Sequence, residues 1–392
     1  MRDPLPLNPQ PTPNEREPER SPEGAPISAP EPSRPLLDAA SFPTQSRLAR
    51  YLEVLNLRIN PPGPEEEFYP SRQLYEDHVG PSILAAATYA SPRLYISGLA
   101  ATTYHWRDIH VRGHAAGGGY SEVRCLRGHD GGFFHMVDIT VDDWVKDVET
   151  NALKIRDETG RLPILHGHST GALVALVAAT RFAATHPGDT LCNGLILSAP
   201  PFELRQALHR VGLVTVKLLH RFSTQAEFWR RLGASLDGGG LDPDIPGKEA
   251  PAARWLPVQM LLQLEKLRPI AAHAATKLEV PLLIIHGTND VMANWKATAS
   301  IYRKIPSVDR ELVIVRGGRH SMMFGPHADE FSARIERWID EHCAVFEARD
   351  ERRLRAAMLG ALRSRWNIPP PAQFKPLPPQ SRRIWYKPWQ RE

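Results

Sequence analysis

Cysteine is scarce in this chain, and long hydrophobic runs are missing. The 392 residues include three cysteines, at positions Cys125, Cys192 and Cys343. A set so sparse and odd in number excludes a disulfide framework and favours a reducing compartment, so we expect a cytoplasmic protein. The sequence has no apolar run of about 20 residues that could span a bilayer, and its first residues lack the apolar core of a secretory signal. We therefore expect a protein that is soluble or at most peripheral to a membrane.

A strong excess of one charge is also missing. Lys and Arg total 48 against 44 Asp and Glu, which gives a formal net charge of +4. Proteins that bind nucleic acids across their surface carry a larger basic excess, so we expect no nucleic-acid partner. Hydrophobic residues make up 42% of the chain, which is enough for one large α/β domain with extensions.

Proline is abundant, and its distribution divides the chain. Residues 1–45 combine Pro, Glu, Ser and Arg with few large apolar side chains, a composition that cannot offset the entropy of ordering, so we predict a disordered arm. Residues 46–348 form the predicted folded domain. Residues 349–392 are predicted to be a basic helix and a Pro- and Trp-rich tail. Three roles stay open for this tail: a strap on the protein's own surface, contact with an anionic membrane, or contact with a protein partner.

From residue 93 onward, apolar runs of strand length alternate with segments of helical length. Strands that are apolar along their whole length are typical of a parallel sheet covered by helices on both faces. The expected strands are 93–98, 122–127, 162–166, 191–198, 281–287 and 311–316. The expected helices are 103–115, one with Thr140 as its N-cap, 172–184, 257–267 and 327–346. Between 200 and 277 the alternation stops, and we predict a helical cap insert over the active site.

The stretch Gly167-His168-Ser169-Thr170-Gly171 has the pattern Gly-x-Ser-x-Gly between a predicted strand and a predicted helix. In this context a sharp turn holds the serine in a strained backbone conformation, and the glycines remove side chains that would clash. The serine hydroxyl then projects at the N-terminus of a helix, where the dipole and free N–H groups stabilise an anion. The pattern therefore predicts Ser169 as a nucleophile, but it is short and needs partners elsewhere.

A serine hydroxyl becomes a good nucleophile when a histidine takes its proton and a carboxylate orients that histidine. After such a strand–turn–helix serine, the acid and then the histidine follow in sequence. The chain offers Asp290 after the run 281–287 and His320 after the run 311–316. Both follow expected parallel strands, at whose carboxyl ends active sites lie. We therefore predict Asp290 and His320 as the partners of Ser169.

Taken together, these motifs resemble the α/β-hydrolase superfamily, in particular its monoacylglycerol lipase/lysophospholipase and serine-aminopeptidase-like branch. The resemblance covers roughly residues 93–345. It rests on Ser97-Gly98-Leu99, Gly119-Tyr120, Leu126-Arg-Gly-His129, Gly167-His-Ser-Thr-Gly171, Leu197-Ser-Ala-Pro-Pro201, His286-Gly-Thr-Asn-Asp290 and Gly318-Arg-His320. It implies an α/β-hydrolase fold without a cofactor, in which Ser169 is the nucleophile, Asp290 the acid and His320 the base.

The resemblance also implies an oxyanion hole formed by the backbone N–H groups of Leu99 and Thr170. Two positions depart from the family's pattern. Family members usually carry His-Gly where this chain has Ser97-Gly98, so we expect the oxyanion loop to be supported differently. The glycine that usually follows the Gly-x-Ser-x-Gly motif is Ala172 here, which is a mild change on a closely packed helix.

Alternatives exist for the acid, for the base and for a metal. Glu203 is the other candidate acid, and His327 is the other candidate base, although it lies where the last helix is expected to begin. His110 and His114 are four residues apart on a predicted helix, but without the neighbouring Glu of a zinc motif they predict no metal site. We interpret His168 as a packing or hydrogen-bonding residue rather than a second base.

The sequence thus predicts a serine hydrolase that cleaves a carboxylic ester through an acyl-enzyme on Ser169. The run from Leu208 to Leu219 is rich in Leu and Val, and as part of the predicted cap it favours a lipid-like acyl chain in a small-molecule substrate. Three alternatives stay open. They are transfer of the acyl group to an alcohol or amine, hydrolysis of an amide or peptide with the same residues, and a non-catalytic scaffold that binds partners through its tails.

Overall fold

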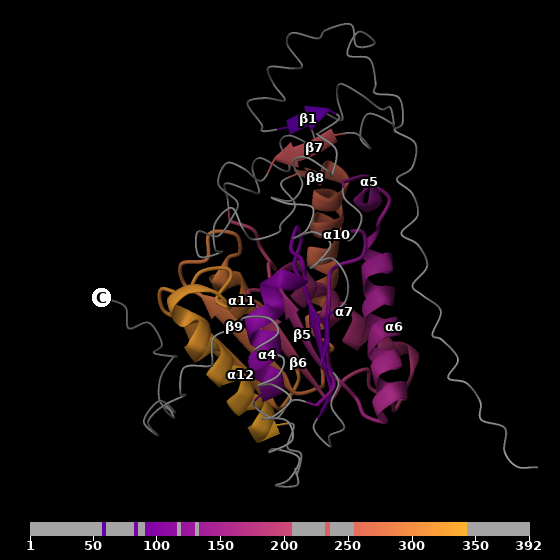
Figure 1. Ribbon diagram of the computed structural model, residues 1–392, viewed down its shortest axis with the longest axis vertical. Helices are drawn as coiled ribbons and strands as arrows, with labels where there is room; N and C mark the ends of the chain where they lie inside the picture. Colours follow the sequence, from indigo (N-terminus) through magenta and orange to yellow (C-terminus); the bar gives the residue numbers. More distant parts are fainter. Residues whose placement is uncertain are drawn as a thin grey trace, which may run out of the picture. The chain divides into compact units, whose positions relative to one another are not determined.

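A seven-stranded sheet with helices on its faces dominates the computed structural model of the chain (Figure 1). The structure describes residues 57–59, 82–84, 91–115, 119–129, 133–205, 232–235 and 255–342. All of these belong to one compact unit, Ser46–Glu392. The predictions for the arm 1–45, the cap run 208–219 and the tail 349–392 fall outside the described residues and stay predictions.

The sheet is mostly parallel, as predicted. Its strand order is β10-β9-β6-β5-β3-β4-β2, and within the described sheet β2 alone is antiparallel to its neighbour. The strands are β2 (Ser82–Leu84), β3 (Arg93–Ile96), β4 (Ser121–Arg124), β5 (Ile164–His168), β6 (Gly194–Ser198), β9 (Leu282–Gly287) and β10 (Arg310–Val315). This order confirms the α/β architecture that the alternating pattern indicated.

Both faces of the sheet are apolar. In β9, Leu282 and Ile284 belong to one buried cluster, whereas Leu283 and Ile285 belong to the other. Successive side chains of a strand point to opposite faces, so each cluster fills the space between one face and its helices. This two-sided burial explains why the strand sequences are continuous apolar runs rather than alternating ones.

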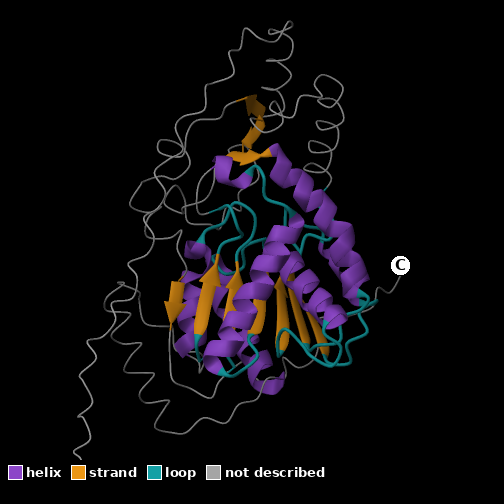
Figure 2. Cartoon of the chain, turned by 90° about the vertical axis from the view of Figure 1, so that its right-hand side faces the viewer, coloured by secondary structure: helices purple, strands orange, loops and turns teal. Residues whose placement is uncertain are grey.

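Helices cover both faces (Figure 2). One layer contains α4 (Arg107–Ala115), which follows the short 3-10 helix η2 (Thr103–Trp106), and α12 (Ala328–His342), which contacts α4. The other layer contains α6 (Val141–Thr159), α7 (Thr170–Thr185) and α10 (Val258–Ala275). The remaining helices are α5 (Phe133–Met136), α11 (Trp295–Tyr302) and the 3-10 helix η3 (Gly325–His327). Among the described helices, none combines the length and apolar character needed to cross a membrane.

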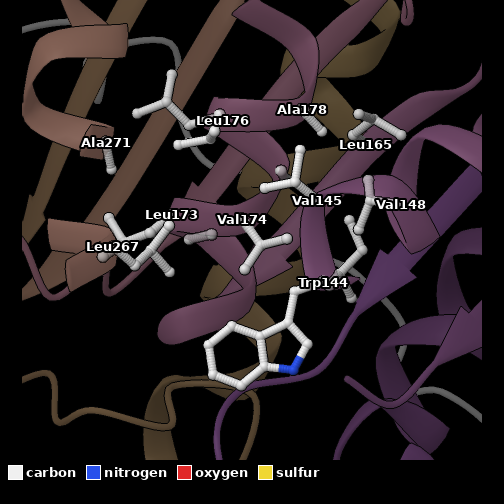
Figure 3. Packing of buried hydrophobic residues seen from close by; sticks show 14 of the residues in the cluster. Trp144, Val145, Val148, Leu165, Leu173, Val174, Leu176, Ala178, Leu267 and Ala271 are labelled. Atoms are coloured by element: carbon white, nitrogen blue, oxygen red, sulfur yellow. The ribbon is translucent and has the colours of Figure 1, made fainter. Parts of the chain in front are cut away.

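Helix α7 packs between α6, α10 and the sheet. Figure 3 shows Leu173 and Val174 of α7 between Val145 of α6 and Leu267 of α10. Twelve of the 16 residues of α7 are buried, so this helix is apolar around most of its circumference. A helix that is apolar all round has to be enclosed by neighbours. The burial of α7 fixes the position of its N-terminus, which follows Ser169 directly.

The predicted start of α6 is confirmed. The backbone N–H of Asp143 donates to Thr140 Oγ1 at 3.3 Å, and the backbone N–H of Thr140 donates to Asp143 Oδ2 at 2.9 Å. This reciprocal arrangement pairs two backbone N–H groups at the helix start. The helix ends at Thr159 and is capped by Gly160, whose φ of +70° is the left-handed conformation that terminates many helices.

A second, small antiparallel sheet contains β1 (Leu57–Ile59), β7 (Leu232–Ser235) and β8 (Trp255–Pro257). Strands β7 and β8 belong to the segment 200–277, for which we predicted a cap. Helix α10 follows β8 directly, and its Leu267 and Ala271 pack with α7 in the layer over the sheet. The rest of the segment, 206–231 and 236–254, lies outside the described residues, so the cap stays a prediction.

Candidate active site

Ser169 occupies a strained turn between β5 and α7. Its backbone angles are φ +52° and ψ −124°, a region that residues other than glycine rarely adopt. Holding a residue there costs about 1–3 kcal/mol and requires support from the surrounding structure. That support comes from the N–H of Ser169, which donates to Ser198 O at 2.8 Å, and from Ala172, whose N–H donates to Ser169 O at 3.0 Å. The turn places the side chain at the carboxyl edge of the sheet.

The glycines of the motif are required by close backbone contacts. A Cβ atom on Gly167 would lie 2.4 Å from Gly171 O, and a Cβ atom on Gly171 would lie 2.4 Å from Ser97 O. Any side chain at either position would therefore overlap a backbone oxygen. The expected steric role of both glycines is confirmed.

The structure brings Ser169, His320 and Asp290 together from three separate loops. His320 Nε2 lies 2.9 Å from Ser169 Oγ, and His320 Nδ1 lies 2.8 Å from Asp290 Oδ2. A carboxylate oxygen only accepts hydrogen bonds, so Nδ1 carries the proton and Nε2 can accept the serine proton. Asp290 follows β9 and His320 follows β10, at the carboxyl ends where the sequence placed them.

The carboxylate of Asp290 is buried and surrounded by donors. Its Oδ1 accepts from the backbone N–H groups of Met292 and Ala293, each at 2.8 Å. Burial opposes the negative charge, but His320 and His286 outweigh this effect and hold the pKa of Asp290 well below its usual value. Asp290 is therefore charged at neutral pH.

The alternative acid, Glu203, and the alternative base, His327, have partners outside the group formed by Ser169, His320 and Asp290. Glu203 is exposed, and its Oε1 accepts a hydrogen bond from the side-chain amide of Asn294 at 2.9 Å. His327 lies at the end of η3, where its nearest acidic partner is Glu330 at 4.0 Å. Neither forms a hydrogen bond with His320 or Ser169 in the described part of the chain.

Leu99 and Thr170, whose N–H groups were expected to form an oxyanion hole, flank Ser169. Thr170 is the first residue of α7, and the first N–H groups of a helix have no partner within the helix. Leu99 follows Gly98, whose position is so close to the turn that an added Cβ atom would lie 3.0 Å from Ser169 Cβ. This proximity suits the expected role, which stays a prediction.

The loop that contains Leu99 has its own supports. Ser97, which replaces the family's usual histidine, donates from Oγ to Thr102 O at 3.3 Å. Ala100 has a φ of +62°, which costs a residue with a side chain about 1–2 kcal/mol, and its N–H donates to His129 Nε2 at 3.0 Å. Sequence reasoning missed His129 in this position, although it lies in one of the motifs that carry the resemblance.

His168 bonds the backbone beside the site, in agreement with the expected hydrogen-bonding role. Its Nε2 lies 3.0 Å from the carbonyl oxygen of His320, to which it donates. Burial lowers the pKa of His168 to about 3, and the nearby His320 ring adds to this effect. His168 is therefore neutral, and its one ring proton is committed to the His320 backbone.

The other histidines of interest bond separate groups. His110 Nε2 lies 2.8 Å from Ser121 Oγ, and His114 Nδ1 lies 3.2 Å from Gly119 O. In the described ranges, no cluster of three or more His, Cys, Asp or Glu side chains is arranged to hold a metal ion.

Comparison with protein families gives one match over much of the chain. The model of the family described as "Serine aminopeptidase, S33" matches residues 100–327. This range contains Thr170, Ser169, Asp290 and His320 but begins just after Leu99. No curated protein matches the chain in sequence.

Comparison with solved structures identifies similar folds. One is from a study of LipS and LipT, two metagenome-derived lipolytic enzymes, with 20% identity, a TM-score of 0.55 and coverage of 67% of this chain and 98% of that chain. A monoacylglycerol lipase from Paleococcus ferrophilus has 18% identity, a TM-score of 0.53 and coverage of 67% and 98%. A soluble variant of monoglyceride lipase from Saccharomyces cerevisiae has 18% identity, a TM-score of 0.52 and coverage of 67% and 91%. At these identities the comparisons show a shared fold.

Proposed function

We propose that this chain, which belongs to the serine aminopeptidase S33 family of α/β-hydrolases, cleaves carboxylic esters through an acyl-enzyme on Ser169. The observation that carries the proposal is the continuous hydrogen-bond chain from Ser169 through His320 to Asp290, with distances of 2.9 and 2.8 Å. These are the groups and the geometry that activate a serine hydroxyl. The strained turn at Ser169 supports the same role.

The reaction proceeds in two steps. Ser169 Oγ attacks the acyl carbon while its proton moves to His320 Nε2, and the backbone N–H groups of Leu99 and Thr170 stabilise the oxyanion by about 3 kcal/mol each. The C–O bond to the alcohol then breaks, and His320 returns the proton to the leaving oxygen. Water repeats the sequence on the acyl-enzyme and releases the acid. Asp290 stays ionised and stabilises the imidazolium.

A lipid-like acyl chain is the substrate class that we favour. The run from Leu208 to Leu219 supplies apolar side chains in the predicted cap. The structures similar in fold include lipolytic enzymes and monoacylglycerol lipases, which supports this choice. The family's description as an aminopeptidase favours a second candidate, the hydrolysis of an amide or peptide bond by the same residues.

A fluorophosphonate probe tests the reaction. This probe phosphonylates an activated serine, so the wild-type protein should be labelled and the Ser169→Ala variant should not. Circular dichroism and a thermal melt establish that both proteins are folded. A folded wild type that is not labelled would overturn the enzyme proposal and leave a non-catalytic scaffold.

A substrate panel tests the bond and the acyl chain. We expect p-nitrophenyl esters of medium and long acyl chains to be cleaved faster than the acetyl ester. Aminoacyl p-nitroanilides should react more slowly than esters, because the amide leaving group is poorer. Faster cleavage of the anilides would favour the peptidase candidate, and strict preference for acetyl would contradict the lipid-like chain. Formation of a new ester when an alcohol is added to the reaction would report transfer of the acyl group from the enzyme to that alcohol.

We place the enzyme in the cytoplasm because its cysteines are few and odd in number. The basic, aromatic tail 349–392 is the segment that would contact an anionic membrane. Co-sedimentation of the full chain with vesicles, with and without phosphatidylserine, tests that contact. Binding that is equal for both vesicles would contradict an electrostatic contact.

A further inference from the structure

His129 is held rigidly by the turn to which it belongs. Its backbone N–H donates to Leu126 O at 3.0 Å, and its Nδ1 lies 3.0 Å from the same oxygen. A further hydrogen bond attaches this turn to α6: Trp144 Nε1 donates to Arg127 O at 3.2 Å. His129 is 2% exposed, so its ring has little freedom to rotate.

The hydrogen bonds of His129 define its protonation. A carbonyl oxygen only accepts, so Nδ1 carries the ring proton that bonds Leu126 O. A backbone N–H only donates, so Nε2 must present a lone pair to Ala100 N at 3.0 Å. Both contacts agree with one neutral tautomer, in which the ring bridges the turn 126–129 and the loop 98–101.

Two hydrogen bonds hold the loop 98–101, and the bridge to His129 is one of them. The N–H of Ala101 donates to Gly98 O at 3.3 Å, which orients the peptide plane between Gly98 and Leu99. In a trans peptide the N–H points opposite to the C=O, so the same bond sets the direction of the Leu99 N–H. The next peptide plane, at Ala100 with φ +62°, is fixed by the bond to His129.

Ser97 does not supply this support. Its hydroxyl donates to Thr102 O, which follows the strained residue Ala100 in the chain. The N–H of Ala100 therefore needs a different acceptor. His129 is that acceptor, and it comes from the loop after β4 rather than from the oxyanion loop itself.

We propose that His129 is a positioning residue for the oxyanion hole: by accepting from Ala100 N–H, it holds the Leu99 N–H in the direction needed by the tetrahedral intermediate. This inference rests on the proposed ester hydrolysis at Ser169. His129 itself does not touch the substrate. It acts on the rate because oxyanion donors are effective when they are already oriented before charge develops.

Two isosteric substitutions separate the contacts of His129. In His129→Gln, the side-chain oxygen reaches the position of Nε2 and can still accept from Ala100. In His129→Asn, the shorter amide reaches only the position of Nδ1, so it keeps the bond to Leu126 and loses the bond to Ala100. Both residues are neutral and polar, so the pair is matched in charge and hydrogen-bonding character.

We expect kcat for a p-nitrophenyl ester to fall about tenfold to hundredfold in His129→Asn, because a small misplacement of a catalytic group has an effect of this size. KM should change little, and His129→Gln should stay within a few fold of the wild type. Affinity for an alkylboronic acid, which forms a tetrahedral adduct with the serine, should fall in parallel with kcat. Equal losses in both variants, or unchanged boronate affinity in the Asn variant, would overturn the proposal.

Amide hydrogen exchange provides a readout that does not depend on activity. The N–H of Ala100 should exchange faster in His129→Asn than in the wild type or in His129→Gln, and unchanged exchange would overturn the bridge. If the Asn variant does not fold, His129→Met fills the space without an acceptor of comparable strength and takes its place. A wild type that neither labels with fluorophosphonate nor cleaves esters would instead overturn the proposed function, and the inference with it.

Discussion

His286 Nε2 lies 3.0 Å from Asp290 Oδ2, and both side chains are fully buried. The pair does not meet the geometry of a hydrogen bond, so the contact is an electrostatic one in a buried site. The same oxygen bonds His320, so two rings share the negative charge of Asp290. A polar ring beside a carboxylate stabilises its negative charge more strongly in a site from which water is excluded.

We predict that His286→Leu lowers kcat about tenfold, because the charge of Asp290 then loses one of its stabilising dipoles in a buried site. His286→Gln should retain most of the rate, since its amide nitrogen can donate from the position of Nε2. Steady-state kinetics on a p-nitrophenyl ester measure both. A Leu variant as fast as the wild type would show that the second ring has only a packing role.

Asp290→Asn should leave the fold intact and lower kcat by a factor on the order of 10⁴. The amide can donate to His320 Nδ1, which would place the ring proton on Nε2, where it cannot accept from Ser169. The matched control is Glu203→Gln, which alters an exposed carboxylate bonded to Asn294 and should leave kcat unchanged. A large loss in the Glu203 variant, with normal turnover in the Asp290 variant, would reverse the two assignments.

The meeting of Ser169, Asp290 and His320 could be predicted because the proposed chemistry constrains local sequence. The turn at Ser169 requires glycines at fixed positions, and the acid and base must follow particular strands. The strands of the large sheet were predictable because burial on both faces requires long apolar runs. The structure confirms the six strands expected there between residues 93 and 316 and their parallel direction, whereas β7 and β8 of the small sheet were not predicted.

His129 and His286 could not be assigned from sequence because their partners depend on tertiary packing. His129 bonds a residue 29 positions away, and no local pattern indicates that contact. Helix α10 shows the same limit: we predicted a helical stretch over residues 257–267, which stops short of Pro269, a residue type that interrupts helical hydrogen bonding. The helix continues to Ala275. Ala271 and Ala275 are fully buried, so the packing of this last part of the helix outweighs the tendency of proline to end a helix.

Gly171→Ala should destabilise the fold by about 3 kcal/mol or more, because the added methyl group overpacks a closed backbone contact. Its Cβ would lie 2.4 Å from Ser97 O and 2.5 Å from Ile96 O. Gly188→Ala is the control: no atom lies within 4 Å of its Cβ, and its φ of +86° accounts for a loss of about 1 kcal/mol. Urea denaturation measures the free energy of unfolding of both variants. Equal losses would show that the turn at Ser169 can expand to accept the methyl group.

Buried neutral histidines should make the fold sensitive to acid. Burial lowers the pKa of His110 and of His168 to about 3, and that of His105 to about 4, from 6.5. In the unfolded chain these rings bind protons below about pH 6.5, whereas in the folded chain they do not. Folding stability is thus fully present above pH 6.5 and falls as the pH drops toward the folded-state values, by about 2 kcal/mol for each ring at pH 5.

Urea midpoints at pH 7, 6 and 5 measure this effect. His110→Gln, which keeps a polar group near Ser121 but cannot gain a proton, should reduce the decline between pH 7 and pH 5. A decline that is identical in this variant and the wild type would mean that His110 has the same pKa in the folded and the unfolded chain, which would contradict the prediction.

The ion pair of buried Arg93 in β3 and partly buried Glu336 in α12 joins the sheet to one helical layer. Arg93 Nη1 and Nη2 donate to Glu336 Oε1 and Oε2 at 2.6 and 2.8 Å. Burial opposes the charge of Arg93, but the attraction of Glu336 outweighs it and raises the pKa of Arg93 above its usual value. The guanidinium is therefore charged, and it would stay charged without its partner.

Glu336→Leu should lower the free energy of unfolding by about 3–5 kcal/mol, because it leaves a buried charge unpaired. The double variant Arg93→Met/Glu336→Leu removes both charges and should recover much of that loss, since apolar side chains of similar volume fit a buried site well. Urea denaturation of the wild type, both single variants and the double variant gives the coupling energy. If the double variant is less stable than Glu336→Leu alone, the packing of the Arg93 side chain, rather than its charge, determines the stability of this contact.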